Sequence, residues 1–422
     1  MLSPFRSITS LPAVPVYFAL MLGQAVCFSL FFTVQLIYQV TVIGLDPLQM
    51  VLVGVVLEST TLLFEVPTGV VADVYSRRRS ILIGITLIGC AYLLEGGIVA
   101  FWSALAGQVF WGLGYTFTSG ATEAWITDEV GEDAVGPIFL RGRQMWLAGI
   151  LIGTIACVAL GSLHTQAPMV LAGLGMFGLA LTLLAIMPER ARPVVYGPAA
   201  SPWARMRETA RAGIRLAAAR RVVRLLILIS LVTGLGAEAW DRLAVPSAIA
   251  RFTFPPLLAW EGPLVWFGLS SVIGTLLGLG AAELFRRTRP DTLSTGAPAM
   301  LLAGCAALQV TAILIYAVTG HLLLAFCMLW LRVMVSAISQ PVETAWLNRH
   351  LEPATRATVL SITSQANSVG QVVGGPALGL VGSVVSLQAA LVGSAVVLSP
   401  TIALYRRLRP RAATAGGLSV AD

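Results

Sequence analysis

Apolar runs of about 20 residues recur along the chain, and short polar or arginine-bearing stretches separate them. Each run is long enough to cross the ~30 Å hydrocarbon layer of a membrane as one helix. The pattern therefore predicts twelve membrane-spanning helices. The expected spans are residues 16–43, 48–74, 80–100, 102–127, 142–163, 168–187, 222–248, 262–285, 295–318, 322–347, 357–381 and 384–405.

The composition favours a membrane protein built only from helices. Hydrophobic residues make up 57% of the 422 residues and charged residues only 11%, whereas a soluble domain carries about 25% charged residues because its surface must be solvated. The first apolar run, residues 15–43, is too long for the apolar core of a cleaved signal peptide. We therefore expect an all-α, multi-pass membrane protein whose first span is retained.

The positive charges indicate how the helices are oriented. All 27 basic residues are arginines, and 24 of them fall in segments that are cytoplasmic when both termini are cytoplasmic. Arg251 falls on the opposite side, while Arg242 and Arg332 fall within spans. By the positive-inside rule we expect cytoplasmic N and C termini, in the inner (plasma) membrane of a bacterium. No basic face is interleaved with exposed aromatic residues, which argues against a nucleic-acid partner.

A polar linker divides the chain into two halves. The predicted domains are an N-terminal six-helix bundle (1–189), a cytoplasmic linker (190–221), a C-terminal six-helix bundle (222–405) and a cytoplasmic tail (406–422). Within the linker, Ser201 caps a predicted helix that begins at Pro202. The arginines of this amphipathic helix and its Trp203 suit a position along the inner leaflet.

The two halves also repeat in sequence. At a fixed offset of 221 residues, Ala124 and Trp125 align with Ala345 and Trp346. The same offset aligns Gln144, Gly149, Gly153 and Gly161 with Gln365, Gly370, Gly374 and Gly382. Internal repeats of this length are typical of transporters, in which two similar bundles move about a shared site. We expect two pseudo-symmetric bundles.

A short motif between the second and third spans carries a family resemblance. Gly69, Asp73, Arg77 and Arg78, with the Val71-Ala72 pair, resemble the loop signature G-x-L-A-D-R-x-G-R-R of the major facilitator superfamily. Val74 and Ser76 depart from the signature. A degenerate copy follows span 8, with Glu283 in the position of Asp73 and with Arg286 and Arg287 after it. Together with the spans, the linker and the repeat, the resemblance covers essentially the whole chain.

The resemblance implies a gating role for this motif. Gly69, Asp73, Arg77, Arg78, Glu283 and Arg286 would latch the two halves together on the cytoplasmic side when the transporter faces outward. Asp73 needs a partner at its helix end, and the positive N-terminus of a neighbouring helix or a loop arginine can supply it. The alternative is that the arginines only set the topology.

Ionisable residues inside spans are functional candidates because a charge at the bilayer centre is costly. Glu58 and Glu65 are seven residues apart in span 2 and share one helical face. Glu238 and Asp241 lie in span 7 close to Arg242. We identify these four acids as candidate proton carriers. The alternatives are an interhelical hydrogen bond for the first pair and a static ion-pair network for the second.

The resemblance also implies that spans 1, 4, 7 and 10 line a central cavity. The candidate cavity residues are Gln24, Gln35, Tyr38, Trp111, Tyr115, Arg242 and Arg332. Helix packing is the alternative role for the polar and aromatic members. Arg332 lies near the membrane midplane, so it must face a carboxylate of the protein or an anionic ligand.

The resemblance implies a secondary active transporter that takes a small molecule and protons as partners in the lipid bilayer. We expect a monomer with no cofactor and no metal, and no nucleotide-binding loop is present. Export of an amphipathic, drug-like molecule is the leading reading, and proton-coupled uptake of a small anionic metabolite is the alternative. Span 4 lacks the arginine and span 5 the Gly-Pro motif of proton-driven drug exporters. A receptor or an intramembrane enzyme is a remote third reading, because no catalytic set of residues is present.

Overall fold

The computed structural model describes residues 12–74, 76–189, 211, 215, 220–257, 260–288, 298–350 and 353–408. The described chain is almost wholly helical, with one isolated β-bridge between Leu257 and Trp260. The helices of the first half are α1 (Ala13–Tyr38), η1 (Gln39–Ile43), α2 (Pro47–Val74), α3 (Arg77–Gly97), α4 (Phe101–Thr118), α5 (Ala121–Val130), α6 (Glu132–Gly161) and α7 (Ala167–Ile186). Those of the second half are α9 (Arg221–Arg251), α10 (Pro263–Thr288), α11 (Pro298–Val318), α12 (Leu322–His350), α13 (Pro353–Val384), α14 (Leu387–Leu398) and α15 (Pro400–Arg407). The expected all-α fold is confirmed.

Ten of the described helical stretches are long and apolar enough to cross a membrane. They correspond to ten of the expected spans, with α1 and η1 forming one of them and α14 and α15 another. The other two expected spans coincide with α4 and α13, which are helical but less apolar. The chain is therefore a multi-pass membrane protein. The predicted linker helix beginning at Pro202 lies outside the described residues.

Two of the predicted spans are interrupted. The fourth breaks after Thr118, and Gly120 has a φ of 72°, a left-handed conformation that glycine adopts without a steric penalty. The short helix α5 then follows as a separate segment. The last span breaks at Pro400, which has no N–H group for a continuous helix. Local backbone chemistry thus explains both differences from the expectation.

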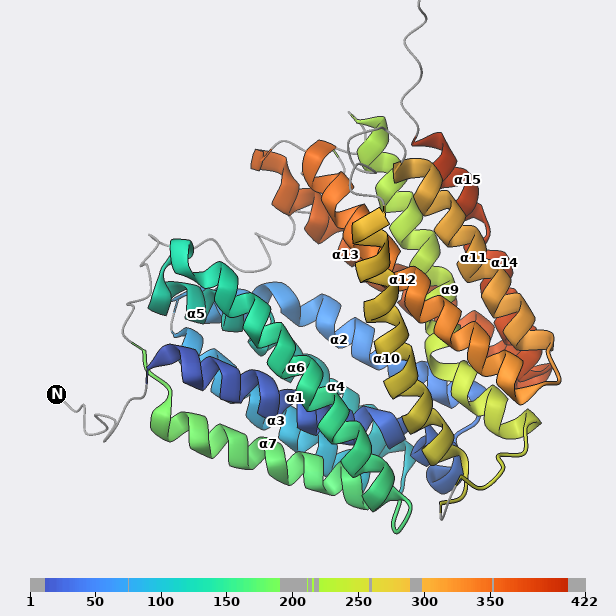
Figure 1. Ribbon diagram of the computed structural model, residues 1–422, viewed down its shortest axis with the longest axis horizontal. Helices are drawn as coiled ribbons and strands as arrows, with labels where there is room; N and C mark the ends of the chain where they lie inside the picture. The colour runs from blue at the N-terminus through green and yellow to red at the C-terminus, as the bar shows by residue number, and fades with distance from the viewer. Residues whose placement is uncertain are drawn as a thin grey trace, which may run out of the picture.

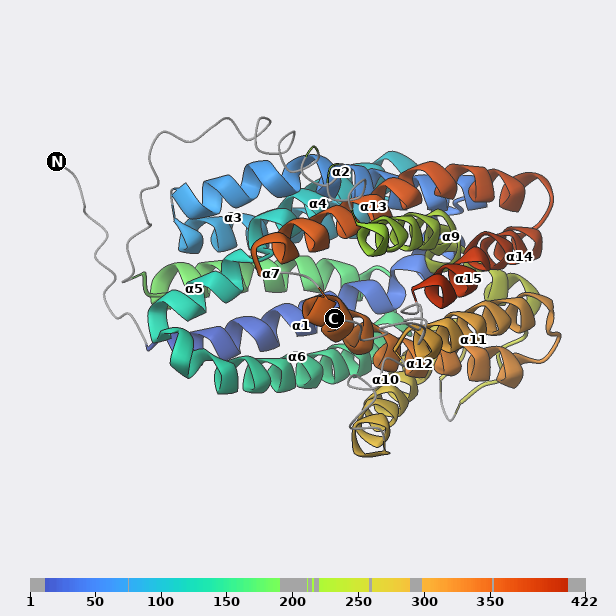
Figure 2. The ribbon, with the colours of Figure 1, turned by 90° about the horizontal axis from the view of Figure 1, so that it is seen from above.

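Two bundles make up the molecule, and they meet at an angle (Figure 1). In the first bundle α1 packs on α6 and α7, and α3 packs on α4 and α7. In the second, α9 packs on α13 and α14, and α12 packs on α10 and α11. The bundles touch chiefly where α2 crosses α13, and Figure 2 shows these two helices side by side from above.

The sequence repeat has a counterpart in the packing of each bundle. Gly149 and Gly153 of α6 face the backbone of α1 so closely that a Cβ on either would collide with it. Their repeat partners, Gly370 and Gly374 of α13, face the backbone of α9 in the same way. Small residues at such contacts let two helices approach closely in a membrane. The two halves are therefore built on the same helix pair.

One end of the molecule is sealed by contacts between the bundles. Gly161 of α6 lies against Leu264 of α10, and its repeat partner Gly382 of α13 lies against Pro47 of α2. Beside them, the Ser383 hydroxyl donates to Asp46 at 3.2 Å and accepts from a backbone N–H of α2 at 2.9 Å. A buried apolar cluster continues this seal, with Leu45, Met50 and Val51 from one bundle and Trp240, Leu243 and Leu378 from the other.

The bundles diverge toward the opposite end, where the arginine-bearing ends of α3, α9, α10 and α15 lie (Figure 1). The outer faces of the bundles carry exposed apolar side chains. Leu181 is 68% exposed and Ile155 is 62% exposed. Such surfaces are stable only against lipid, since a soluble protein rarely exposes so many apolar side chains together.

Candidate functional site

A cavity of about 660 Å³ opens between the two bundles. The first bundle contributes residues of every α-helix from α1 to α7, and the second contributes one face of α13. Of the predicted site residues, this cavity brings together Gln24, Glu58, Glu65, Trp111 and Tyr115. Ser364, Gln365, Asn367, Ser368 and Gln371 form the facing wall.

Aromatic rings form one side of this cavity. Trp111 and Tyr115 are one helical turn apart on α4, and their rings stack with centroids 5.4 Å apart. Phe28 of α1 lies between Trp111 and Trp146, at 6.5 Å and 5.8 Å from their ring centroids. The wall therefore offers flat apolar surfaces with electron-rich faces, which suit a ligand that is both apolar and positively charged.

Carboxylates form the other feature of the cavity. The Glu58 carboxylate accepts a hydrogen bond from Ser368 of α13 at 2.8 Å, so it links the two bundles. Glu65 lies two turns further along α2 and is exposed to the cavity. Glu123, at the start of α5, also lines it. Three acids thus surround a space that holds no basic lining residue among the described part of the chain.

The acids predicted in span 7 lie at the contact between the bundles. Glu238 is 2% exposed, and its carboxylate accepts a hydrogen bond from Arg242 at 2.9 Å. This ion pair packs against Gly54 of α2, where a Cβ would collide with both side chains. Asp241, on the neighbouring face, is exposed and makes no ion pair with a described residue. The pair of Glu238 and Arg242 is internally neutral and belongs to the seal.

Arg332 lies in a second cavity of about 560 Å³, bordered by α9, α10 and α12. Its guanidinium stacks over the Trp240 ring with the central carbon 4.2 Å from the centroid. Its Nη1 atom is buried and has no hydrogen-bond partner among the described residues. Hydroxyl and amide side chains line the same space: Ser270, Ser271, Thr275, Ser336 and Gln340. Arg332 thus has no carboxylate at ion-pair distance in the described part of the protein.

Three of the predicted cavity residues line neither cavity, and one of them, Arg242, lies in the seal with Glu238. Gln35 and Tyr38 are buried inside the first bundle and do not line either cavity. The Gln35 amide donates to Glu95 of α3, a fully buried acid that the sequence reading did not single out. The signal that would have found Glu95 is a set of glutamines in apolar segments, because each of them needs a polar partner when buried.

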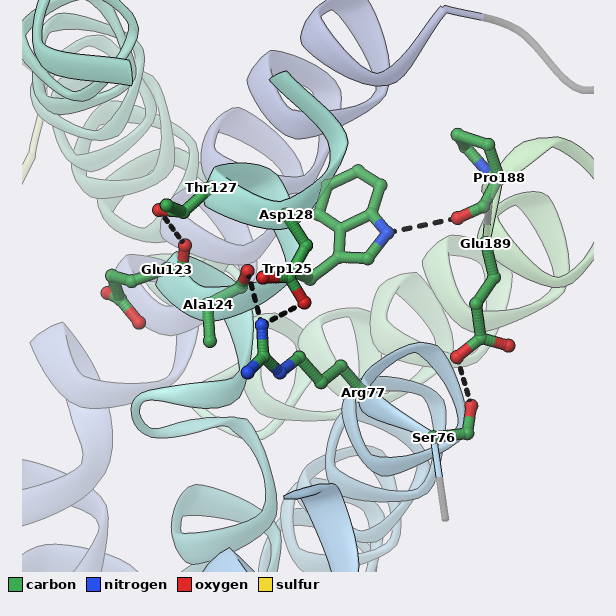
Figure 3. A network of polar contacts seen from close by, with 9 residues as sticks. All are labelled: Ser76, Arg77, Glu123, Ala124, Trp125, Thr127, Asp128, Pro188 and Glu189. Atoms are coloured by element: carbon green, nitrogen blue, oxygen red, sulfur yellow. Dashed lines mark hydrogen bonds and ion pairs between the residues drawn. The ribbon is translucent and has the colours of Figure 1, made fainter. Parts of the chain in front are cut away.

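Figure 3 shows how the loop motif is held in the first bundle. Arg77, at the start of α3, forms an ion pair with Asp128 of α5 and donates to the Ala124 carbonyl oxygen at 2.8 Å. Ser76 donates to Glu189, and the Trp125 indole donates to the Pro188 carbonyl oxygen at 2.9 Å. The motif therefore ties α3 and α5 to the segment that follows α7, all within one bundle.

The remaining motif residues are placed as follows. The side chain of Asp73 lies outside the described residues. Gly69 of α2 has open space where a Cβ would stand. The Arg78 guanidinium donates to the backbone of α7. In the second copy, Glu283 pairs with Arg286 at 2.7 Å and with Arg287 at 2.6 Å, exposed at the end of α10.

Comparison with protein-family models finds no match. A curated relative, the uncharacterized MFS-type transporter YxaM of Bacillus subtilis (strain 168), is 32% identical over 126 residues. That match covers 30% of this chain and 32% of the relative, so the two proteins align over only about a third of the relative's length.

Solved structures match the chain over nearly its full length. A mutant form of the nucleoside transporter NupG has a TM-score of 0.74 and 14% identity, over 94% of this chain and 99% of its own. A bacterial homologue of the human lysosomal transporter Spinster, in an inward-facing and unoccupied conformation, has a TM-score of 0.68 and 13% identity, over 96% and 97%. At these identities the likeness establishes the fold.

Proposed function

The chain has the fold of the major facilitator superfamily, as its loop motif indicated, and on that premise we propose that it is a secondary active transporter working by alternating access. The cavity between two pseudo-symmetric bundles supports this role, because rocking of the bundles exposes such a cavity to each side of the membrane in turn. The proposal includes twelve spans, with α4 and α13 as the two polar ones.

The arginine distribution supports an assignment of the sides. The divergent end of the molecule carries the arginine-bearing helix ends, so we place it in the cytoplasm together with both termini. The sealed end, around Asp46 and Ser383, then faces outward. The structure would thus represent the inward-facing state of a transporter in the plasma membrane of a bacterium.

The acidic and aromatic lining of the central cavity is the observation from which we infer the class of substrate. Three carboxylates, of Glu58, Glu65 and Glu123, face the stacked rings of Trp111 and Tyr115. A cation inside this space gains from the carboxylates and from the ring faces, and an apolar body gains from contact with the rings. We infer an amphipathic cation as the substrate.

Proton coupling follows from the same carboxylates. A carboxylate that binds a proton loses the charge that attracts a cation, so proton and substrate compete for Glu58 and Glu65. If the cavity crosses with either a proton or the cation bound, the transporter exchanges protons on one side of the membrane for the cation on the other. With protons entering the cell, the exchange exports the cation.

The environment of Arg332 favours a second candidate function, transport of a small organic anion. Its unpartnered Nη1 atom and the hydroxyl groups of its cavity would suit a carboxylate, which the guanidinium can hold with two parallel hydrogen bonds. Under this reading the protein imports the anion together with protons.

Purified protein in liposomes distinguishes the two candidates. Ethidium, an amphipathic cation, is added outside liposomes with an acidic lumen, and p-aminobenzoate, a small anion, is added outside liposomes in an acidic exterior buffer. Exchange of ethidium for luminal protons, lost in the Glu58→Gln/Glu65→Gln double variant, supports the first candidate. Accumulation of p-aminobenzoate from an acidic exterior, lost in Arg332→Ala, supports the second. No proton-linked flux of either probe contradicts both.

A further inference from the structure

Glu95 forms a polar site that is separate from both cavities. It lies near the end of α3 and is 0% exposed. Three glutamine amides surround its carboxylate: Gln35 of α1, Gln39 of η1 and Gln108 of α4. Gln35 Nε2 lies 3.1 Å from both carboxylate oxygens, Gln39 Nε2 lies 2.7 Å from Oε1, and Gln108 Nε2 lies 3.2 Å from Oε2. We call these four residues the Glu95 cage.

The cage is arranged for a negative charge, because each amide presents its N–H₂ group and an ionised carboxylate only accepts hydrogen bonds. The acceptor atoms of two of these amides are left over. Oε1 of Gln39 and Oε1 of Gln108 are buried and have no hydrogen-bond partner among the described residues. A buried polar atom without a partner is uncommon in a native protein and requires an explanation.

A second protonation state explains these unpartnered oxygens. When the Glu95 carboxyl carries a proton, it becomes a donor and needs an acceptor. A half-turn of the Gln39 or Gln108 amide about its last side-chain bond places Oε1 where the N–H₂ group stood. The cage can therefore satisfy both the ionised and the protonated carboxyl while every helix stays in place.

A charge from the other bundle acts on the cage. Arg242 of α9 interacts electrostatically with Glu95, and its own partner Glu238 offsets part of that charge. The tyrosines Tyr38 and Tyr92 are titratable groups that also interact with Glu95. The acids on the neighbouring helices α2 and α5 (Glu58, Glu65 and Glu123) line the central cavity instead. The described part of α7 carries no ionisable residue.

We propose that Glu95 is a second proton-binding site of the transporter, one that the substrate does not enter. The inference rests on the proposed function for its role in transport. When the bundles part at the sealed end, Arg242 moves away with its own bundle and water gains access to the end of α3, so Glu95 takes up a proton from outside. In the inward-facing state Arg242 returns, the carboxylate of the cage is restored, and its proton leaves to the central cavity past Tyr92, which lies one turn away on α3 and lines that cavity. Two protons would then enter for each cation exported.

Infrared spectroscopy tests proton binding without any substrate. The purified protein is titrated toward acid, and the C=O stretching band of protonated carboxyl groups is recorded. We expect one band to be missing in Glu95→Gln and retained in Glu58→Gln and in Glu123→Gln, which are matched carboxyl controls. An unchanged band pattern in a folded Glu95→Gln protein would overturn the proposal. If Glu95→Gln cannot be purified, Glu95→Asp keeps an ionisable group in the cage, and its band must shift.

Transport stoichiometry tests the coupling. Ethidium accumulation in liposomes is measured against the pH difference, with the membrane potential clamped to zero by potassium and valinomycin. Each coupled proton raises the accumulation ratio about tenfold per pH unit, so the slope should fall from about two decades per unit in the native protein to about one in Glu95→Gln. Equal slopes would overturn the second site while leaving the transporter proposal intact. Absence of ethidium transport in the native protein would contradict the cation-export proposal, and the infrared result would still decide proton binding.

Discussion

Gly54 lacks a side chain, and this leaves room for the buried ion pair of Glu238 and Arg242. The carboxylate of Glu238 and the guanidinium of Arg242 occupy the volume that a Cβ at this position would take. Both charges come from the opposite bundle, so this glycine determines whether the two bundles can close around them. In the proposed alternating-access cycle, this contact exists only in the state in which the two bundles are closed around it.

The first prediction follows from this contact. Gly54→Ala should force the ion pair aside and cost about 1–3 kcal/mol, the usual penalty for overpacking a close contact. Because the penalty falls only on the sealed state, the variant should favour the outward-facing one. The measurement is the labelling rate of a cysteine placed at the sealed end, which should rise. Gly178→Ala of α7, where a Cβ meets open space, is the control and should label like the native protein.

The second prediction compares two arginines inside the membrane. Arg242→Ala leaves the Glu238 carboxylate buried without its partner, so we expect a loss of about 3–5 kcal/mol in stability and partial rescue by Glu238→Gln. Arg332→Ala removes a guanidinium that has no carboxylate partner at ion-pair distance, so it should change stability much less and need no such rescue. Melting temperatures in detergent provide the test. An equal drop for both variants, with Arg332→Ala rescued by Asp241→Asn, would mean that Arg332 is neutralised from within.

At the scale of the helix, the loop motif acts through the ends of α3 and α5 and the segment after α7. Arg77 ties the start of α3 to α5 by an ion pair with Asp128 that is partly exposed. Exposed ion pairs contribute about 0–1 kcal/mol to the stability of the fold. The main effect of this network is therefore to fix the orientation of the helix ends. Gly69 has no neighbour at its Cβ position in this structure, which leaves room for the closer approach that the proposed alternating-access cycle requires.

The third prediction concerns Asp73, which the family resemblance assigns to the gate. Asp73→Asn should lower the rate of ethidium exchange by more than tenfold, an effect of about 1.4 kcal/mol or more on the transition between states. The melting temperature should stay within the spread of neutral surface variants. Asp133→Asn, at the start of α6, is a control for the loss of one negative charge at the same end of the protein. Normal exchange by Asp73→Asn would remove it from the gate.

At the scale of the whole molecule, closure of the outer end is the feature that transport must reverse. The fourth prediction uses the hydrogen bond between Asp46 and Ser383 across that closure. The double variant Asp46→Cys/Ser383→Cys should form a disulfide on mild oxidation, which holds the bundles together and stops ethidium exchange. Reductant should restore the flux, and Ser383→Cys alone should be insensitive to oxidant. Full flux in a quantitatively cross-linked sample would show that this contact does not open.

The sequence predicted the features that repeat along the chain. Apolar runs located the helices to within a few residues at most ends, and the matching glycines Gly149 and Gly370 anticipated the shared helix pair of the two bundles. Spacing on one helix also predicted that Glu58 and Glu65 face the same space. These features depend on the spacing of residues within one helix or between the two repeats, and this spacing can be read from the sequence alone.

What the sequence did not predict depends on contacts between helices. Gln35 was expected in the cavity, but its amide lies in the Glu95 cage, because the rotation of α1 about its axis is set by packing against α6 and α7. Arg332 and Glu238 lie near each other in the predicted topology, yet the i, i+4 partner Arg242 is already bound to Glu238. The choice among possible partners needs three-dimensional distances.

The sealed outer end also determines where the membrane voltage falls. In the proposed orientation the cavity opens to the cytoplasm, so its water and ions hold the electrical potential at Glu58 close to that of the cytoplasm. Nearly all the voltage therefore drops across the apolar layer that contains Leu45, Met50 and Leu243. Each net charge that crosses this layer gains or loses about 2.3 kcal/mol per 100 mV. The conformational change that moves the charged cavity residues from one side of this layer to the other should thus have a rate that depends steeply on voltage.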